Sequence, residues 1–156
     1  MSNLVADKPD EKMQQRLWPD HCVQATKGAE LVPSLNASKL NLVIEKGSDE
    51  RVEMYSAFAD AFGNLTAGKG GVNHDLAQVL KDNGITDVYC VGVAGEYCLS
   101  STALDAAKAG FTTYVIEEGQ RCSNPGAWGE IRSRLFTGRV EVVSENSEQV
   151  QQLLSR

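Results

Sequence analysis

The sequence has no run of apolar residues long enough to cross a membrane, and it does not open with a signal-type segment, because its first 16 residues are polar and charged. It also lacks an excess of basic charge: 15 Lys and Arg stand against 21 Asp and Glu, for a formal net charge of −6. Such a balance disfavours binding to nucleic acid or to an anionic membrane. We therefore expect a soluble protein of the cytoplasm, with the nucleus and the peroxisome as further compartments, and no nucleic-acid or membrane partner.

The cysteine patterns of a disulfide framework, or of a zinc or redox site, are missing too. The four cysteines include no Cys-x-x-Cys pair. They are Cys22, Cys90, Cys98 and Cys122. Repeats and low-complexity segments are absent, and 156 residues suit one domain with its own core. We predict a disordered tail or loop over residues 1–16 and a folded domain over residues 17–156.

Patterns typical of strands and helices alternate along most of the chain. Short apolar, β-branched runs predict strands at 40–45, 88–93, 112–117 and 140–143. Cap signals and periodic apolar residues predict helices that follow Asn73, start near Cys98, follow Asn124-Pro125, and follow a capping box of Asn146 and Gln149. This alternation predicts an α/β fold with a parallel sheet.

Cys98 lies where the expected strand 88–93 ends and a helix begins. On that helix Leu99, Ala103 and Ala106 form a face suited to packing on the sheet. The unpaired N–H groups and partial positive charge of a helix N-terminus favour a thiolate, and the N–H groups can hold the oxyanion of an attacked carbonyl. Cys98 is therefore either a small buried hydrophobic residue or a nucleophile, and this stretch alone leaves both readings open.

Two further side chains stand in positions suited to chemistry. Lys46 follows the expected strand 40–45, and α/β sheets place their ligands at the carboxyl ends of strands; a solvated charge is the alternative. His21 is a candidate metal ligand, but one histidine makes no metal site without partners, because zinc sites need three or four ligands. Neither residue defines a function by itself.

Three separated stretches occur in one order along the chain. They are Trp18-Pro19-x-His21-Cys22-Val23, then Glu45-Lys46-Gly47 with Tyr55-Ser56-Ala57-Phe58, then Gly92-Val93-Ala94-Gly95-Glu96-Tyr97-Cys98 with Thr102-Ala103-x-Asp105-Ala106. Together they resemble the nicotinamidase/pyrazinamidase members of the isochorismatase-like hydrolases. The third stretch is common to that superfamily, and the first two narrow the resemblance to nicotinamidases. It extends from residue 17 to about residue 121, and the rest matches in pattern only.

The resemblance implies catalytic roles for the matching residues. Cys98 matches the nucleophile that attacks a carboxamide carbon and forms a thioester. Lys46 matches the lysine whose charge favours the thiolate. The backbone N–H groups of Ala94 and Cys98 match the oxyanion hole, with a cis peptide bond between Val93 and Ala94.

It also implies a substrate pocket and a metal. Tyr55 matches an aromatic residue of the pocket, and Trp18 would shape the rim. His21 matches one ligand of a site, usually zinc but also another divalent metal, that binds the pyridine nitrogen. The reaction would convert nicotinamide to nicotinate and ammonia in NAD salvage, that is, in pyridine nucleotide biosynthesis. Pyrazinamide is a second expected substrate. The sequence leaves the oligomeric state open, with a homo-oligomer as one option.

One part of the family pattern has no match. Members begin with a strand that carries the Asp general base, and a second strand supplies an Asp-x-His pair of metal ligands. Asp7 is followed by Lys8 and Pro9, so we do not accept it as that base. We therefore expect a Rossmann-like, three-layer isochorismatase-like domain that lacks its first two strands. The family strand order 3-2-1-4-5-6 would leave the strand at 40–45 without a neighbour.

These departures predict that the chain binds zinc poorly and hydrolyses nicotinamide very slowly. Two alternative functions stay open. One is a non-catalytic chain that binds a related full-length subunit, which an assay of nicotinamide hydrolysis with added zinc would distinguish. The other is a different isochorismatase-like cysteine hydrolase, against which the segment with Trp18 and His21 argues.

Overall fold

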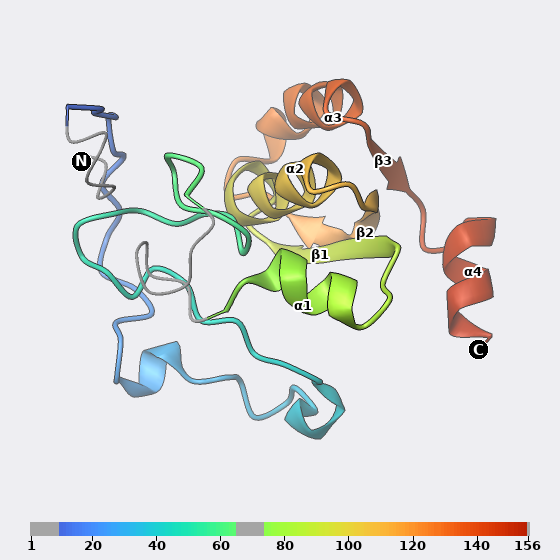
Figure 1. Ribbon diagram of the computed structural model, residues 1–156, viewed down its shortest axis with the longest axis horizontal. Helices are drawn as coiled ribbons and strands as arrows, with labels where there is room; N and C mark the ends of the chain where they lie inside the picture. Colours follow the sequence, from blue (N-terminus) through green and yellow to red (C-terminus); the bar gives the residue numbers. More distant parts are fainter. Residues whose placement is uncertain (1–9, 65–73, 156) are drawn as a thin grey trace.

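The computed structural model describes residues 10–64 and 74–155. Helices and strands alternate in the part that follows residue 74, as the sequence predicts (Figure 1). The elements there are α1 (Leu76–Asp82), β1 (Asp87–Val93), the π-helical turn η3 (Gly95–Leu99), α2 (Ser100–Lys108), β2 (Thr112–Arg121), the 3-10 turn η4 (Pro125–Ala127), α3 (Trp128–Thr137), β3 (Val140–Val143) and α4 (Glu148–Leu154). The α/β class is confirmed.

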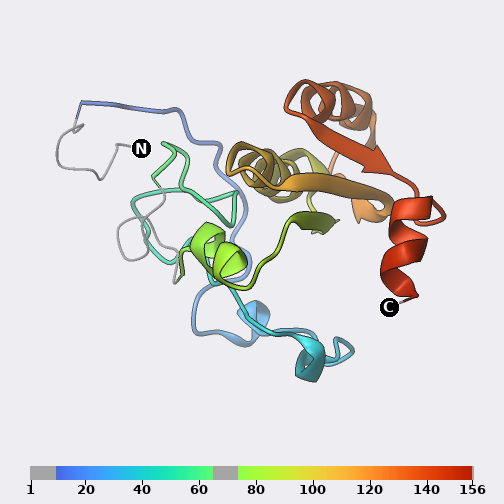
Figure 2. The same cartoon turned by 45° about the vertical axis from the view of Figure 1, so that its right-hand side comes forward.

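The strands form one parallel sheet in the order β1-β2-β3. Parallel neighbours need a crossover connection, and α2 and α3 supply these connections. Helices α2 and α3 lie on one side of the sheet, and α1 packs against α2 on the same side, at the edge formed by β1. Helix α4 lies against the other face, beside Tyr89 and Tyr114 (Figures 1 and 2). Helices on both sides of a parallel sheet give the expected three layers.

The core lies between the sheet and helices α2 and α3. The helix face predicted from periodicity is buried: Leu99 is 5% exposed, and Ala103 and Ala106 are 0% exposed. Leu135 of α3 and Val115 of β2 are also 0% exposed and pack in the same cluster as Leu99 and Ala103. Small alanines on α2 let the helix approach the sheet closely, and this fixes the position of the turn that precedes it.

Strand β2 is longer than the expected 112–117, because it continues past an irregularity. Cys90 of β1 pairs with Val115, but Gly92 pairs with Gln120, so the register shifts between the two pairs. A Cβ atom on Gly119 would lie 2.6 Å from Val91 Cγ1, so glycine permits the close approach of the strands here. The extension carries β2 alongside the end of β1, next to η3.

Residues 10–64 contain two short 3-10 turns, η1 (Lys27–Ala29) and η2 (Ala37–Lys39), and are otherwise irregular. The predicted strand at 40–45 is wrong: the segment makes no strand pairing, and Leu42 and Val43 are 41% and 45% exposed. An apolar, β-branched run becomes a strand only where a neighbour accepts and donates its backbone hydrogen bonds. Here the described residues provide no such neighbour.

Two predicted helix caps also differ. Asp75 caps α1 by accepting a hydrogen bond from the Gln78 N–H at 3.0 Å, while the predicted cap Asn73 lies outside the described residues. Ser147 precedes α4 in place of the predicted Asn146, and the capping box with Gln149 is not formed. Both helices begin one or two residues later than expected, which is the usual scale of error for helix ends.

None of the helices in the described segments is both long and apolar enough to span a lipid bilayer. Residues 10–16 form no helix and are exposed except for Gln15, which donates a hydrogen bond to Glu53 at 2.9 Å. Residues 1–9 of the predicted tail lie outside the described part. The division of the chain at residue 16 stays a prediction.

Candidate active site

Cys98 lies in the turn that joins β1 to α2. The peptide bond between Val93 and Ala94 is cis, as the family resemblance implies. The turn η3 then closes on Ala94, whose carbonyl accepts hydrogen bonds from the N–H groups of Tyr97 (3.0 Å) and Leu99 (3.2 Å). Cys98 is half-buried between these residues, on the last turn before α2. A helical turn that leads into α2 therefore begins where the sequence predicts it.

The Lys46 ammonium reaches the Cys98 thiol. Its Nζ donates a hydrogen bond to Cys98 Sγ at 3.3 Å, although the two residues are 52 positions apart. It donates a second hydrogen bond to the Met54 carbonyl oxygen at 3.0 Å. Two hydrogen bonds hold the cation in place beside the sulfur.

The loop that carries Met54 is irregular but well buried. Met54 is 1% exposed and Phe58 is 4% exposed. The Ala57 N–H donates to Thr102 Oγ1 on α2 at 3.1 Å, which attaches the loop to the helix that follows Cys98. The residues that hold Lys46 and those that hold Cys98 are thus parts of one packed unit.

Three aromatic side chains pack against one another, and one of them is Tyr97, the residue before Cys98. The Tyr97 ring packs edge-on against Trp18, with centroids 4.9 Å apart, and lies 5.4 Å from the Tyr55 ring. Trp18 Nε1 donates to the Tyr55 hydroxyl at 3.3 Å. Arg16 donates to the Tyr97 hydroxyl at 2.9 Å and stacks over Trp18, 4.5 Å from its centroid. Flat aromatic walls of this kind suit an aromatic ring as ligand.

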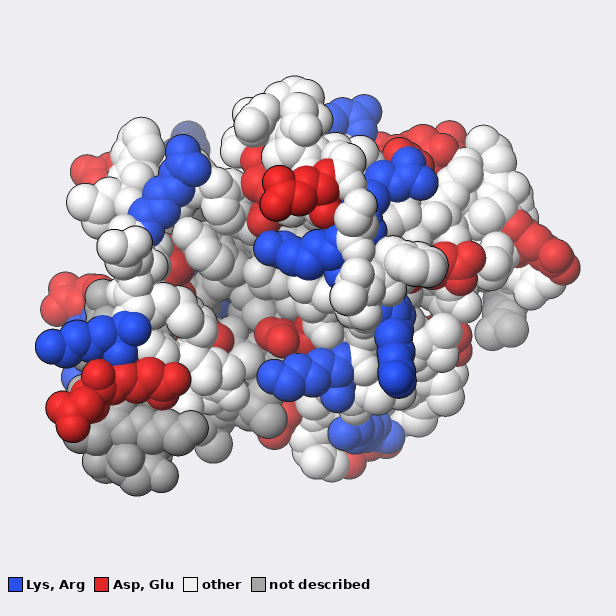
Figure 3. Space-filling view, turned by 90° about the horizontal axis from the view of Figure 1, so that it is seen from above, with Lys and Arg blue, Asp and Glu red and all other residues white. Residues whose placement is uncertain are grey.

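Two hollows adjoin the site. Cys98 lines a groove of about 370 Å³ together with Leu99 and Thr102 and with apolar side chains of α1 and β1. Tyr55 and Tyr97 line a second, larger cleft of about 670 Å³ against residues 13–16 and α2. The thiol thus lines one hollow and the two tyrosines line the other. Acidic and basic side chains are interspersed over the face seen in Figure 3.

The other cysteines near the sheet are in less reactive settings. Burial raises the pKa of the Cys90 thiol to about 11, and this residue is 8% exposed in the core. Burial and the neighbouring Glu96 carboxylate raise the pKa of Cys122. Both effects favour the neutral thiol, which is a poor nucleophile.

Glu96 ties the Cys98 turn to the loop that follows β2. Its carboxylate accepts hydrogen bonds from Ser123 Oγ (2.5 Å), from the Ser123 N–H (3.1 Å) and from the Asn124 N–H (2.9 Å). Partial burial disfavours its charge, but these hydrogen bonds outweigh that cost and lower the pKa of Glu96 to about 2. The carboxylate is therefore ionised near neutral pH.

His21 stands apart from any set of metal ligands. It is exposed, and its Nδ1 lies 2.7 Å from the Pro19 carbonyl oxygen. A donated Nδ1–H would leave Nε2 as the nitrogen for a metal. However, residues 10–64 and 74–155 include no group of three or more His, Cys, Asp or Glu side chains that could hold an ion. The described donor set therefore does not fit a zinc site.

The structure brings together most of the residues singled out in the sequence. Lys46 lies at Cys98, and Trp18 and Tyr55 join through Tyr97, whereas His21 has no fellow ligand among the described residues. The roles assigned to these residues, including the oxyanion hole of Ala94 and Cys98, stay predictions. The sequence analysis assigned no role to Tyr97 or Glu96. Their position directly before Cys98 was the signal that could have pointed to them.

Comparison with known proteins identifies related sequences. The isochorismatase domain matches residues 3–136. The nicotinamidase of Acinetobacter baylyi is 42% identical over 155 residues, which cover 93% of this chain and 68% of that protein. The nicotinamidase of Schizosaccharomyces pombe is 38% identical over 131 residues, covering 84% of this chain and 56% of that protein. The chain thus spans only part of the length of these relatives.

Solved structures agree with the sequence matches. The yeast nicotinamidase bound to the inhibitor nicotinaldehyde superposes with a TM-score of 0.79 at 28% identity, covering 92% of this chain and 65% of that one. The pyrazinamidase of Pyrococcus horikoshii in complex with zinc gives a TM-score of 0.67 at 34% identity, covering 82% and 63%. Both carry the fold described above.

Proposed function

Because the chain belongs to the isochorismatase-domain family, we propose that its Cys98 site is built for the nicotinamidase reaction, the hydrolysis of nicotinamide to nicotinate and ammonia. The observation that carries the proposal is the 3.3 Å contact between Lys46 Nζ and Cys98 Sγ. It joins a cation to a thiol at a helix start, and the residue before that thiol, Tyr97, belongs to an aromatic cluster suited to a pyridine.

The reaction proceeds through a covalent intermediate. The Cys98 sulfur adds to the carboxamide carbon, and the carbonyl oxygen takes up the negative charge near the N–H groups of Ala94 and Cys98. The C–N bond then breaks, the nitrogen leaves with a proton as ammonia, and a thioester remains. Water adds to the thioester carbon, the C–S bond breaks, and nicotinate and the free thiol are released. One water is consumed for each amide.

Lys46 and the aromatic residues have separate parts in this scheme. The ammonium favours the thiolate before attack and stays fixed by the Met54 carbonyl during it. Tyr97, Tyr55 and Trp18 are assigned to the pyridine ring because they form an aromatic cluster whose member Tyr97 directly precedes Cys98. Pyrazinamide differs from nicotinamide by one ring nitrogen and would fit the same walls. Nicotinate would then enter pyridine nucleotide biosynthesis.

Departure of ammonia requires a proton, and the described residues leave this step weakly supported. In the segments 10–64 and 74–155, no carboxylate is hydrogen-bonded to the Cys98 sulfur; Lys46 is the charged group found there. The same segments lack a zinc ligand set, and no step above requires a metal. The described residues thus supply a cation for the attack by sulfur, but they supply no carboxylate at the sulfur to assist the release of ammonia.

An aldehyde probe tests the attack without requiring a leaving group. Nicotinaldehyde, an inhibitor bound in the related yeast enzyme, can accept the Cys98 sulfur at its carbonyl carbon and form a thiohemiacetal. We expect nicotinaldehyde to protect Cys98 from alkylation by iodoacetamide at neutral pH, as followed by peptide mass spectrometry. Benzaldehyde, which lacks the ring nitrogen, is expected to protect it less.

The Cys98→Ala variant provides the control for the remaining thiols. In that variant the aldehyde should leave the labelling of Cys22, Cys90 and Cys122 unchanged. Equal protection of all four cysteines in the unmodified chain, or no protection of Cys98 at concentrations that saturate the thiol of a small-molecule standard, would contradict the proposal.

A further inference from the structure

We propose that Glu96 is a positioning residue for the nucleophile: its carboxylate holds the Cys98 turn at the distance from Lys46 that the thiol requires. The inference rests on the proposed function of the Cys98 site. It assigns to Glu96 no contact with substrate, and its effect on the chemistry passes through Cys98.

The contacts of Glu96 join two separate segments of the chain. Glu96 lies two residues before Cys98 on η3, and Ser123 and Asn124 lie on the loop between β2 and α3. Three hydrogen bonds from this loop end on one carboxylate, two of them from backbone N–H groups. Hydrogen bonds to a charged acceptor are the stronger kind, and several on one carboxylate fix its position.

The partner loop is itself anchored. Asn124 Oδ1 accepts a hydrogen bond from the Gly126 N–H at 3.1 Å and so caps η4, which leads directly into α3. Helix α3 packs into the core through Ile131 and Leu135, which are 7% and 0% exposed. Glu96 therefore connects the Cys98 turn to a rigid element and not to a free loop.

The neighbouring residue Gly95 also lies close to another element. A Cβ atom on Gly95 would lie 2.5 Å from Gln120 Oε1 and 2.8 Å from Cys122 Sγ, so the backbone of η3 lies directly against the end of β2. With Lys46 on Cys98 itself, three residues of the turn, Gly95, Glu96 and Cys98, lie against other parts of the chain. Release of the Glu96 contact would let the thiol move relative to Lys46, and shifts near 1 Å already change rates by about 10²-fold.

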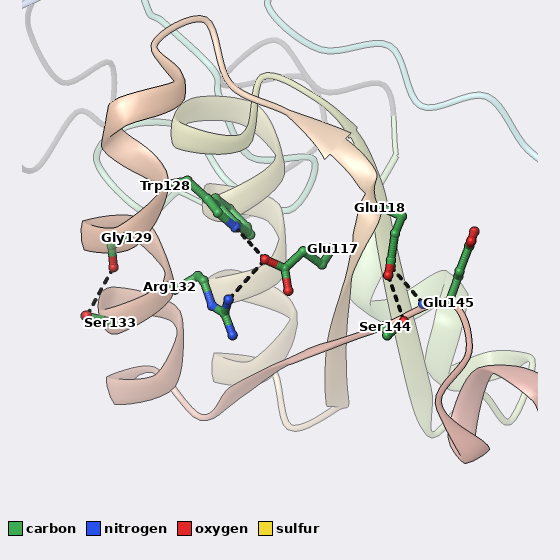
Figure 4. A network of polar contacts seen from close by, with 8 residues as sticks. All are labelled: Glu117, Glu118, Trp128, Gly129, Arg132, Ser133, Ser144 and Glu145. Carbon is green, nitrogen blue, oxygen red and sulfur yellow. Dashed lines mark hydrogen bonds and ion pairs between the residues drawn. The ribbon is translucent and has the colours of Figure 1, made fainter.

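Glu118 offers a matched control elsewhere in the fold. Its carboxylate accepts hydrogen bonds from Ser144 Oγ (2.7 Å) and from the Glu145 N–H (2.8 Å), which attaches the loop after β3 to β2 (Figure 4). The chemistry matches that of Glu96, but the loop leads into α4 and away from Cys98. Hydrogen bonds lower the pKa of Glu118 as well.

The test is a pair of double-mutant cycles on the full chain, read out as the second-order rate constant for iodoacetamide alkylation of Cys98. We expect Glu96→Ala to slow alkylation by about 5-fold when Lys46 is present and by less than about 1.5-fold in the Lys46→Met background. Ser123→Ala should give a smaller change of the same kind. Glu118→Ala should leave the rate unchanged in both backgrounds.

If Glu96 positions the thiol, the effect of Glu96→Ala on the alkylation rate depends on the presence of Lys46. If the substitution only loosens the fold, the effect is the same with and without Lys46. An equal effect of Glu96→Ala in both backgrounds, no effect in either, or an effect matched by Glu118→Ala would overturn the proposal. Glu96→Gln, which keeps one acceptor oxygen, serves if Glu96→Ala does not fold. Alkylation needs no amide substrate, so this test can succeed or fail independently of whether nicotinamide is hydrolysed.

Discussion

Single cysteines in this fold differ in how well their surroundings support a thiolate. At pH 7 a thiol whose pKa is about 11, as burial makes that of Cys90, is ionised in only about 1 molecule in 10⁴. Burial and the Glu96 carboxylate raise the pKa of the Cys122 thiol. Cys98 instead accepts a hydrogen bond from an ammonium at the start of a helix.

We therefore predict that brief alkylation near neutral pH modifies Cys98 before the other three thiols. Peptide mapping by mass spectrometry measures the order of labelling. The denatured chain, in which all four thiols are equivalent to within sequence effects, is the reference. Labelling of Cys22 or Cys122 ahead of an intact Cys98 would refute the assignment of the nucleophile.

At the scale of elements, the turn η3 depends on a glycine that lets it lie against β2. Gly95→Ala would place a methyl group 2.5 Å from Gln120 Oε1 and 2.8 Å from Cys122 Sγ, so the turn must shift. We expect a loss of about 1–3 kcal/mol in the free energy of unfolding, together with slower alkylation of Cys98. Urea denaturation and the alkylation rate measure the two effects.

Gly138→Ala separates the two consequences of overpacking. A methyl group there would lie 2.1 Å from Leu104 Cδ2, between α2 and the end of α3 and away from the thiol. The free energy of unfolding should fall by a similar amount, about 1–3 kcal/mol, while Cys98 reacts at its normal rate. A slower Cys98 in Gly138→Ala would mean that the thiol reports general stability and not the position of η3.

The loops after β2 and β3 are each attached by a carboxylate, and this predicts a pH dependence of stability. The pKa of Glu96 falls from 4.5 to about 2 on folding, and that of Glu118 is lowered too. A lowered pKa in the folded state stabilises the protein above the unfolded value and loses this effect as pH falls. The contribution of Glu96 should thus be complete above about pH 5 and decline between pH 4.5 and about pH 2.

Urea denaturation of the unmodified chain and of Glu96→Gln measures this contribution directly. The difference in the free energy of unfolding should be larger at pH 6 than at pH 2.5, because protonation removes the charge that the substitution also removes. Glu118→Gln should follow the same direction. A difference that stays constant over this range would show that the charge of Glu96 contributes nothing to folding.

At the scale of the whole molecule, the described residues include a nucleophile and its cation, but neither a set of zinc ligands nor a carboxylate hydrogen-bonded to the thiol. A catalytic zinc usually has three protein ligands, and no group of that size occurs among the residues described here. General acid–base assistance is typically worth about 10²–10⁴-fold, and no carboxylate of these residues is hydrogen-bonded to Cys98. We predict that the purified chain of 156 residues binds zinc poorly and releases ammonia from nicotinamide very slowly.

Isothermal titration with zinc and an ammonia-release assay, each run beside Cys98→Ala, test this prediction. Turnover near about one per second that disappears in Cys98→Ala would prove the prediction wrong. It would mean that another residue supplies the proton. If the chain binds zinc with micromolar affinity and His21→Ala abolishes this binding, His21 is a zinc ligand together with other side chains of the protein in solution.

The sequence by itself determined what depends on local pattern. Strand 140–143, the buried face of Leu99, Ala103 and Ala106, and the turn before α2 follow from periodicity and cap residues within a few positions of one another. The position of Cys98 at a helix start belongs to this class. The cis bond after Val93 does not, because it was expected from family resemblance and not from pattern.

Tertiary structure decided what depends on neighbours distant in the chain. The apolar run at 40–45 has the composition of a strand but lacks a pairing partner among the described residues, and pairing, not composition, makes a strand. The extension of β2 required close approach to Val91, and the clamp of Glu96 on Ser123 required both loops to be in place. Contacts across 27 or 52 residues follow from the packing of whole elements, which no local window of sequence contains.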